Sequence, residues 1–376
     1  MNRVLTIITF LFIVVLAGSL MAEITLTGDA RLRPRLDLQD KTVTDSISTQ
    51  TKTTDGYYYY RARLNAKTDI GDGWFGHVQL GTNGFAYWTG KFGEGATPSS
   101  SSISGGGKGS VDFMLIYFGR KTKEFGYMGG LIPINALTNP ILDLHYYSHK
   151  MVDVPYFLYS NNSAHGFTGY IGLKNGSKIN ATVMVDNNLK KTETTIDSLT
   201  LGPIVTAESD MKDQYTVMLD APLKLSDFVV QPVAFLTAIA TDGAEKPMTF
   251  GANITTPKIG DFTLYGSFGS STQSESGTAE YSAWYARLKA VGKLGKGTFT
   301  GWVDIANKEF DITKQQNKFM YFWIAYEIPV YKSDVGSVSI KPTWRHIAEK
   351  HEDAAGSEIY DFTREKIELT IDFKFK

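Results

Sequence analysis

Five arginines are spaced so that their side chains can act together. They are Arg31, Arg33, Arg35, Arg61 and Arg63. A guanidinium group stays charged at any relevant pH and presents a rigid fork of donors to carboxylate or phosphate. If the two groups of arginines lie side by side, they form one cationic surface that binds anions. The alternative is that they pair with nearby carboxylates such as Asp29 and Asp37 and only support the local structure.

The arginines belong to two stretches with a strict period of two. In Glu23–Asp37, small or apolar residues alternate with polar or charged ones, and Tyr57–Ile70 repeats the pattern. This period indicates β-strands with two chemically opposite faces. A strand of about 15 residues is long for a soluble protein, where about 5–6 is usual, but suits a tilted strand that crosses a bilayer.

The cost of burying charge in lipid decides which face is which. One arginine on the lipid face of a barrel costs roughly 2–4 kcal/mol near the midplane, so five would cost on the order of 10–20 kcal/mol. That is comparable with the whole stability of a typical domain. The arginines therefore point into a wet interior and the aliphatic face meets lipid. In the hairpin, we expect Arg31 level with Arg63, and Arg33 and Arg35 level with Arg61.

The composition and the amino-terminal residues indicate in which cellular compartment the protein is expected. Residues 1–22 have one early arginine, an apolar run and then small residues, which is the layout of a cleaved secretory signal peptide. The expected mature chain is 23–376. There is no cysteine, which excludes disulfides and thiolate chemistry. The net charge of −1 gives no reason to expect nucleic acid as a partner.

Short turns and long loops alternate along the rest of the chain. Asp69–Gly73 has the composition of a tight turn, whereas Leu38–Gly56 is polar, lacks periodicity and is expected to be a long loop. The whole pattern predicts an all-β fold, a transmembrane antiparallel up-and-down β-barrel of sixteen strands, with fourteen or eighteen left open. Sixteen strands leave an aqueous channel inside. Arg287, Arg345 and Arg364 are expected to add to its cationic wall.

The final strand resembles that of bacterial outer-membrane porins. Ile367, Leu369, Ile371, Phe373 and Phe375 alternate with polar residues, although Lys376 follows the last aromatic residue. The first strand and its arginines also resemble those of substrate-selective porins. The resemblance implies a bacterial outer-membrane location, passive diffusion of small hydrophilic solutes, recognition of the last strand by the barrel-assembly machinery, and a homotrimer. The arginines favour anionic or zwitterionic solutes.

The third loop, 135–163, is unusually rich in apolar and aromatic residues for a solvated loop. By the porin resemblance, it folds into the barrel as a constriction loop, and its Asp143 and Asp153 face the five arginines. A transverse field across such a gap filters solutes by charge. The alternative is that the loop packs at a subunit interface.

Other residues carry weaker signals. Aromatic residues near the expected strand ends, Trp302 and Phe319 among them, are expected in the girdles at the membrane interfaces. Tyr57 and Tyr59 could instead stack on a sugar. Of the six histidines, only His145 and His149 have a metal-ligand spacing, and we expect neither a metal site nor a cofactor. Two alternative functions remain: an outer-membrane enzyme of the lipase or protease type, and a plugged structural or adhesive barrel.

Overall fold

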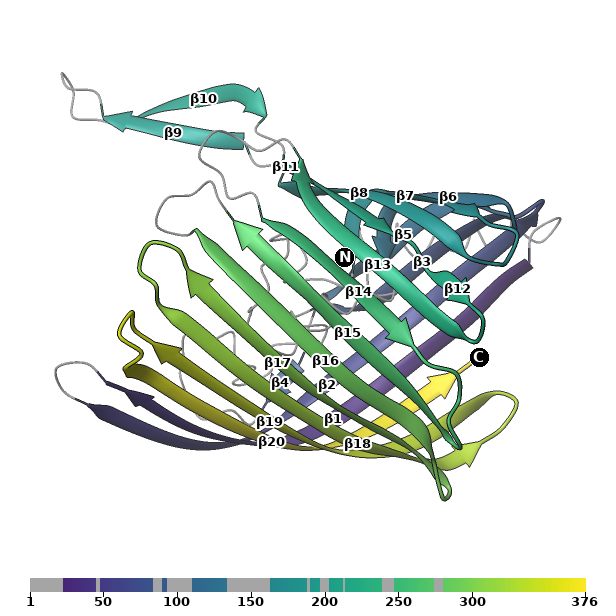
Figure 1. Cartoon of the computed structure of the whole chain (residues 1–376). Helices are drawn as coiled ribbons and strands as arrows, with labels where there is room; N and C mark the ends of the chain where they lie inside the picture. Colours follow the sequence, from purple (N-terminus) through teal and green to yellow (C-terminus); the bar gives the residue numbers. More distant parts are fainter. Residues whose placement is uncertain are drawn as a thin grey trace.

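The computed structural model is a closed antiparallel β-barrel (Figure 1). It describes residues 23–44, 48–83, 90–92, 110–133, 163–187, 190–196, 203–211, 214–238, 247–273 and 280–376. The expected signal peptide, 1–22, lies outside the described residues. So does nearly all of the expected constriction loop, including Asp143 and Asp153. In the described ranges, no helix has the length and apolar character needed to cross a bilayer.

Sixteen strands form the barrel wall. In order round the ring they are β1 (Glu23–Val43), β2 (Thr49–Gly71), β3 (Trp74–Asn83), β5 (Ser110–Lys121), β6 (Phe125–Pro133), β7 (Ser163–Gly172), β8 (Lys178–Asn187), β11 (Gln214–Asp220), β13 (Phe228–Ala238), β14 (Met248–Thr255), β15 (Phe262–Gln273), β16 (Tyr281–Leu294), β17 (Gly297–Phe310), β18 (Gln316–Lys332), β19 (Gly336–Glu352) and β20 (Glu358–Phe375). Three short additions are β4 (Gly90–Phe92) on β2, β12 (Leu223–Leu225) on β13, and a separate hairpin of β9 (Lys190–Ile196) and β10 (Pro203–Met211).

The ring closes between the first and last strands. β1 pairs with β2 on one side and with β20 on the other, so that Gly28 lies opposite Phe375 and Arg31 opposite Asp372. Closure leaves no unpaired edge, which is the condition for a β-structure to span a bilayer. The predicted sixteen-stranded antiparallel barrel is therefore confirmed.

One side of the wall is taller than the other. β18, β19, β20, β1 and β2 have 17 to 23 residues each, whereas β11 has 7. The prediction that Leu38–Gly56 is a long loop was wrong, because β1 and β2 stay paired up to Val43 and Thr49. A hairpin in water on both faces needs no apolar alternation, so hydrophobic periodicity did not reveal it.

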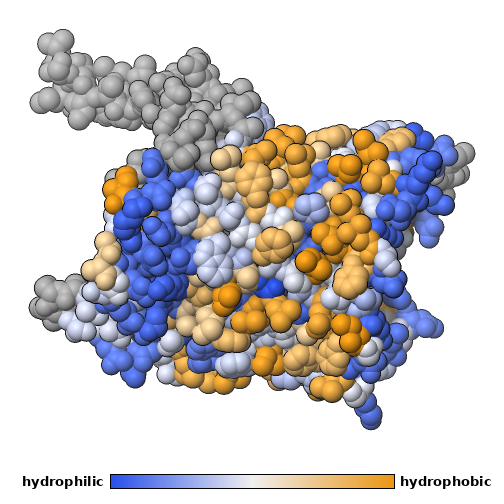
Figure 2. Space-filling view, in the orientation of Figure 1, coloured by the Kyte–Doolittle hydropathy of each residue, from blue (hydrophilic) through white to orange (hydrophobic). Residues whose placement is uncertain are grey.

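The outer face carries the apolar members of the alternating pattern. Leu32, Leu64, Ile324 and Ile367 are each 39–52% exposed, as expected of side chains that meet lipid. Figure 2 shows an apolar band between two hydrophilic margins. Such a band is the outer surface of a transmembrane barrel.

Two of the aromatic residues expected in the interface girdles lie on the interior face of the wall instead. Phe319 is 8% exposed and alternates with the outward-facing Met320, which is 40% exposed. Trp302 lies opposite Trp323 in the β17–β18 pair and packs on the buried interior cluster around Tyr321. The expectation that these two residues form a girdle was wrong. Aromatic type and position along the chain do not reveal on which side of the wall a residue lies.

Candidate functional site in the lumen

Alternation along β1 and β2 places all five predicted arginines on the interior face. The register pairs Arg31 with Arg61 and Asp29 with Arg63. Arg33 and Arg35 lie opposite Tyr59 and Tyr57, respectively. The predicted register was therefore wrong by two residues for Arg31 and Arg33 and by four for Arg35. A shift by an even number of residues keeps the same face, so the interior placement was unaffected.

Glu368 on β20 joins three arginines. Arg345 on β19 lies 2.7 Å from its Oε2, Arg33 lies 3.7 Å away, and Arg35 makes the closest contact. The Glu368 residue is 3% exposed. Since a buried charge is tolerated only when it is paired, this carboxylate is what allows three guanidinium groups to pack together.

Asp29 and Asp372 bind the other predicted arginines. Arg61 and Arg63 donate to separate oxygens of Asp29 at 2.9 and 2.8 Å. Arg31 pairs with Asp372, two residues beyond Thr370. The Thr370 hydroxyl in turn accepts a hydrogen bond of 2.9 Å from Arg33 Nε. These contacts hold the guanidinium groups in fixed orientations.

Tyr57 and Tyr59 belong to the same network. The Tyr57 hydroxyl donates to Asp37 at 2.7 Å and accepts from Arg35 at 3.0 Å. The Arg35 guanidinium lies 4.6 Å from the centre of the Tyr59 ring, within cation–π range. Arg364 also donates to Asp37. The two tyrosines thus position Arg35, which favours this role over sugar stacking.

Cationic side chains outnumber carboxylates in this network. Among the described residues, eight arginines form ion pairs with five carboxylates. The arginines are Arg31, Arg33, Arg35, Arg61, Arg63, Arg287, Arg345 and Arg364, and the carboxylates are Asp29, Asp37, Asp304, Glu368 and Asp372. The two interpretations of the arginines are therefore compatible: they brace the wall and also leave it with an excess of positive charge.

The side chains differ in their access to the interior space. The Arg63, Arg364 and Arg31 side chains are 29%, 22% and 19% exposed, whereas those of Arg35 and Arg345 are 8% and 7% exposed. A solute in the interior would meet the first three directly. The buried arginines act mainly through packing and through their field.

Aromatic rings flank the network on β17 and β18. The Trp302 and Trp323 rings are 4.1 Å apart, and the Arg345 guanidinium lies 3.8 Å from the centre of the Trp323 ring. Arg287, which pairs with Asp304, lies 5.4 Å from the Trp302 ring. Stacking on flat rings restricts the arginine rotamers without adding negative charge.

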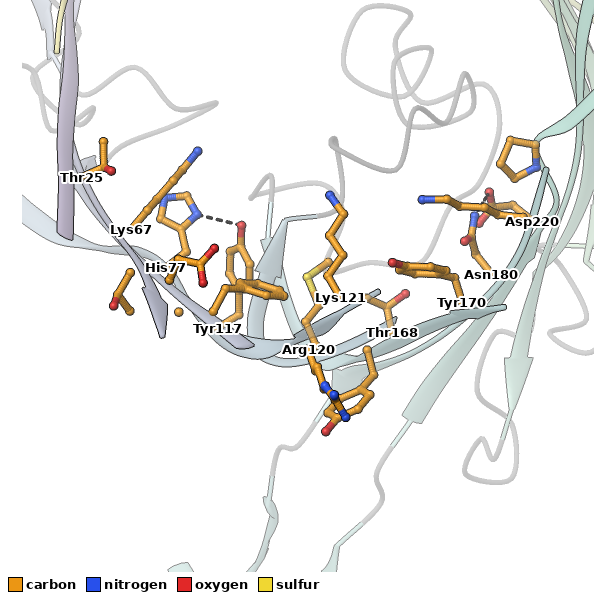
Figure 3. Close-up of a pocket in the computed structure, with 18 of the residues that line it drawn as sticks. Thr25, Lys67, His77, Tyr117, Arg120, Lys121, Thr168, Tyr170, Asn180 and Asp220 are labelled. Atoms are coloured by element: carbon orange, nitrogen blue, oxygen red, sulfur yellow. Dashed lines mark hydrogen bonds between the residues drawn. The ribbon is translucent and has the colours of Figure 1, made fainter. Parts of the chain in front are cut away.

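A cavity of about 860 Å³ lies elsewhere in the interior (Figure 3). Its lining residues, which include Asp69, Lys121, Lys178 and Asp220, lie beside the short turns. His77 bonds to the Tyr117 hydroxyl at 2.7 Å on one side. The sequence alone did not reveal this cavity, because single polar residues on separate strands form no local motif.

The described part of the chain holds no group of three or more potential metal ligands. His346 and His351 bond to Glu365 and Glu349, and His77 bonds to Tyr117 and Asn65. None of these four partners is a serine or an aspartate, the residues that the two enzyme types require. His145 and His149, the two histidines with metal-ligand spacing, lie outside the described residues.

The fold is that of the bacterial outer-membrane porins, as the final strand predicted. The chain is similar to an anion-selective porin from Comamonas acidovorans, with a TM-score of 0.55, 11% identity, and coverage of 94% of this chain and 100% of that one. The outer membrane channel DcaP of Acinetobacter baumannii gives a TM-score of 0.53 and 12% identity over 94% and 98% of the two chains. OmpT, an outer membrane protein of Vibrio cholerae, gives a TM-score of 0.51 and 9% identity over 94% of this chain and 99% of that one. No protein-family model and no curated protein matches the sequence.

Proposed function

We propose that this protein is a bacterial outer-membrane porin, a channel for passive diffusion of small hydrophilic solutes that favours anions or zwitterions. The observation that carries the proposal is the interior network of eight arginines and five carboxylates. Cationic groups that line a pore set a preference for anions, because they lower the electrostatic energy of an anion inside. Folds similar to this one include a porin described as anion-selective.

The test is electrical. Purified protein in a planar bilayer should give discrete conductance steps, and a salt gradient should give a reversal potential of the sign that anion preference requires. A clear preference for cations would overturn the selectivity. A well-folded protein without conductance would overturn the channel itself and favour the plugged structural barrel.

The same preparation tests the enzyme alternative. We expect no hydrolysis of ester or peptide substrates above that of a buffer control. Hydrolase activity that persists when the conductance is blocked would favour an outer-membrane enzyme.

The proposal includes location and assembly. Residues 1–22 would direct secretion and be removed, and the strand ending at Phe375 would be recognised by the barrel-assembly machinery. The protein would be found in outer-membrane fractions. A homotrimer is proposed from the porin similarity, since one related fold is described as a trimer form. Cross-linking in mild detergent should give a trimer band, and a monomer alone would contradict this part.

A further inference from the structure

Asp220 is the buried carboxylate of the cavity beside the short turns. The residue is 4% exposed. Its Oδ2 accepts hydrogen bonds from the side-chain amides of Asn180 at 2.8 Å and Gln231 at 2.7 Å, and its Oδ1 has no hydrogen-bond partner among the described residues. Among the described residues, no lysine or arginine forms an ion pair with Asp220. It therefore differs from the five carboxylates of the arginine network, all of which are neutralised.

The surrounding amides are held in one orientation. Gln231 accepts from Asn253 at 3.3 Å, and Asn253 accepts from the Ser267 hydroxyl at 2.5 Å. This chain of hydrogen bonds runs over β11, β13, β14 and β15, and it commits the side-chain amide of Gln231 to Asp220. The arrangement saturates Oδ2 and leaves Oδ1 as an acceptor for a group that the described residues do not supply. An unsatisfied buried acceptor costs free energy, so a ligand that donates to this carboxylate would stabilise the arrangement.

Two lysines line the cavity away from Asp220. They are Lys67 on β2 and Lys121 on β5, and neither forms an ion pair with another of the described residues. In Figure 3, Lys67 and His77 lie on one side of the cavity, Asp220 and Asn180 lie on the other, and Lys121 extends into the space between. The cavity thus presents cations, the exposed carboxylates of Glu23 and Asp69, and one buried carboxylate, that of Asp220.

We propose that this cavity binds a zwitterionic solute. The ammonium group of the solute would pair with the Asp220 carboxylate, and its own carboxylate would meet Lys67 and Lys121. A volume of about 860 Å³ is ample for a small organic molecule. This inference rests on the proposed function, since it needs a solute-accessible interior, and it narrows the solute class from anions or zwitterions to zwitterions at this site.

The site is separate from the arginine network. β11, which carries Asp220, lies halfway round the ring from β20, which carries Glu368. The two surfaces share none of the lining residues named here. Variants in the cavity should therefore leave the arginine network unchanged.

The test measures binding directly. We would titrate detergent-folded full-length protein with ω-amino acids of increasing chain length, and compare each with the carboxylate and the ammonium ion of the same length, by saturation-transfer NMR. At least one ω-amino acid should bind about tenfold more tightly than both of its singly charged analogues, because two desolvated charge pairs form instead of one.

Asp220→Asn is the decisive variant. The asparagine oxygen can accept the hydrogen bonds from Asn180 and Gln231, so the fold is kept, but a donor now stands where Oδ1 was. Affinity for the ω-amino acid should fall at least about tenfold. Glu23→Gln is the matched control, because Glu23 lines the same cavity but is exposed, and it should bind as the wild type does. The double variant Lys67→Met, Lys121→Met should bind the ω-amino acid no better than the ammonium ion.

Each outcome is decisive. Equal binding by Asp220→Asn and the wild type would overturn the site, as would a series in which no ω-amino acid exceeds its singly charged analogues. A wild-type protein that conducts ions but fails these titrations would overturn the zwitterion site alone. A protein that shows the titrations but no conductance would overturn the channel and keep the site.

Discussion

Arg345 lies 2.7 Å from Glu368 on the neighbouring strand, and the same carboxylate also holds Arg33 and Arg35 of β1. This contact connects β19, β20 and β1 across the closure of the barrel. The arginine network and the closure therefore depend on the same buried side chain.

Glu368→Gln should destabilise the barrel. Three arginines would then surround a neutral amide, and removing one partner of a buried ion pair costs about 3–5 kcal/mol. The measurement is the free energy of unfolding in denaturant, followed by tryptophan fluorescence. Glu358→Gln is the control, because Glu358 pairs with Lys350 where both side chains are over 40% exposed, and it should change stability by less than about 1 kcal/mol. Equal effects of the two variants would contradict the role of Glu368.

Arg63→Gln and Arg35→Gln should separate selectivity from stability. The Arg63 side chain is more exposed than that of Arg35, and without Arg63 its partner Asp29 would still be paired with Arg61. We expect Arg63→Gln to reduce the preference for anions while the free energy of unfolding changes by less than about 1 kcal/mol. Arg35→Gln should cost about 1–3 kcal/mol, because it removes a buried hydrogen bond to Tyr57 and a buried contact with Glu368, which keeps Arg33 and Arg345. Reversal potentials and unfolding curves of both variants provide the check. An unchanged permeability ratio in Arg63→Gln would count against a selectivity role.

Ile324→Lys tests the lipid-facing surface. Ile324 is 45% exposed midway along the outer face of β18. A lysine at the midplane should destabilise the protein by about 2–4 kcal/mol in lipid vesicles. Ile312→Lys, in the turn between β17 and β18, is the control: Ile312 is 57% exposed but lies beyond the strands, and should tolerate the charge. If both substitutions were equally tolerated, the apolar band would not be the membrane-facing surface.

Gly28→Ala should weaken the closure of the barrel. A Cβ at Gly28 would lie 2.7 Å from the Arg63 carbonyl oxygen and would overlap the Phe375 ring. The ring can move but the backbone carbonyl cannot, so we expect a loss of about 1–3 kcal/mol. Gly56→Ala, where nothing among the described residues lies within 4 Å of the new Cβ, should be neutral. The yield of folded barrel after refolding and its unfolding free energy provide the measurement, and a neutral Gly28→Ala would contradict the close packing at this point.

The sequence by itself determined the face on which each arginine lies. Alternation is a property of neighbouring residues, and the cost of charge in lipid leaves one choice, so the residue pattern alone places Arg31 and Arg61 inside the barrel. The number of strands followed from the same local signals. The extension of β1 and β2 to Val43 and Thr49 did not, because outside the membrane both faces of a hairpin are wet.

Only the tertiary structure decided what the arginines contact. Asp372 and Thr370 are 341 and 337 residues away from Arg31 and Arg33. They become neighbours only because the last strand closes against the first. Asp220 likewise accepts hydrogen bonds from amides on β8 and β13, and it shares a cavity with lysines on β2 and β5. Such contacts depend on strand register and ring closure, and no local pattern of residues encodes either.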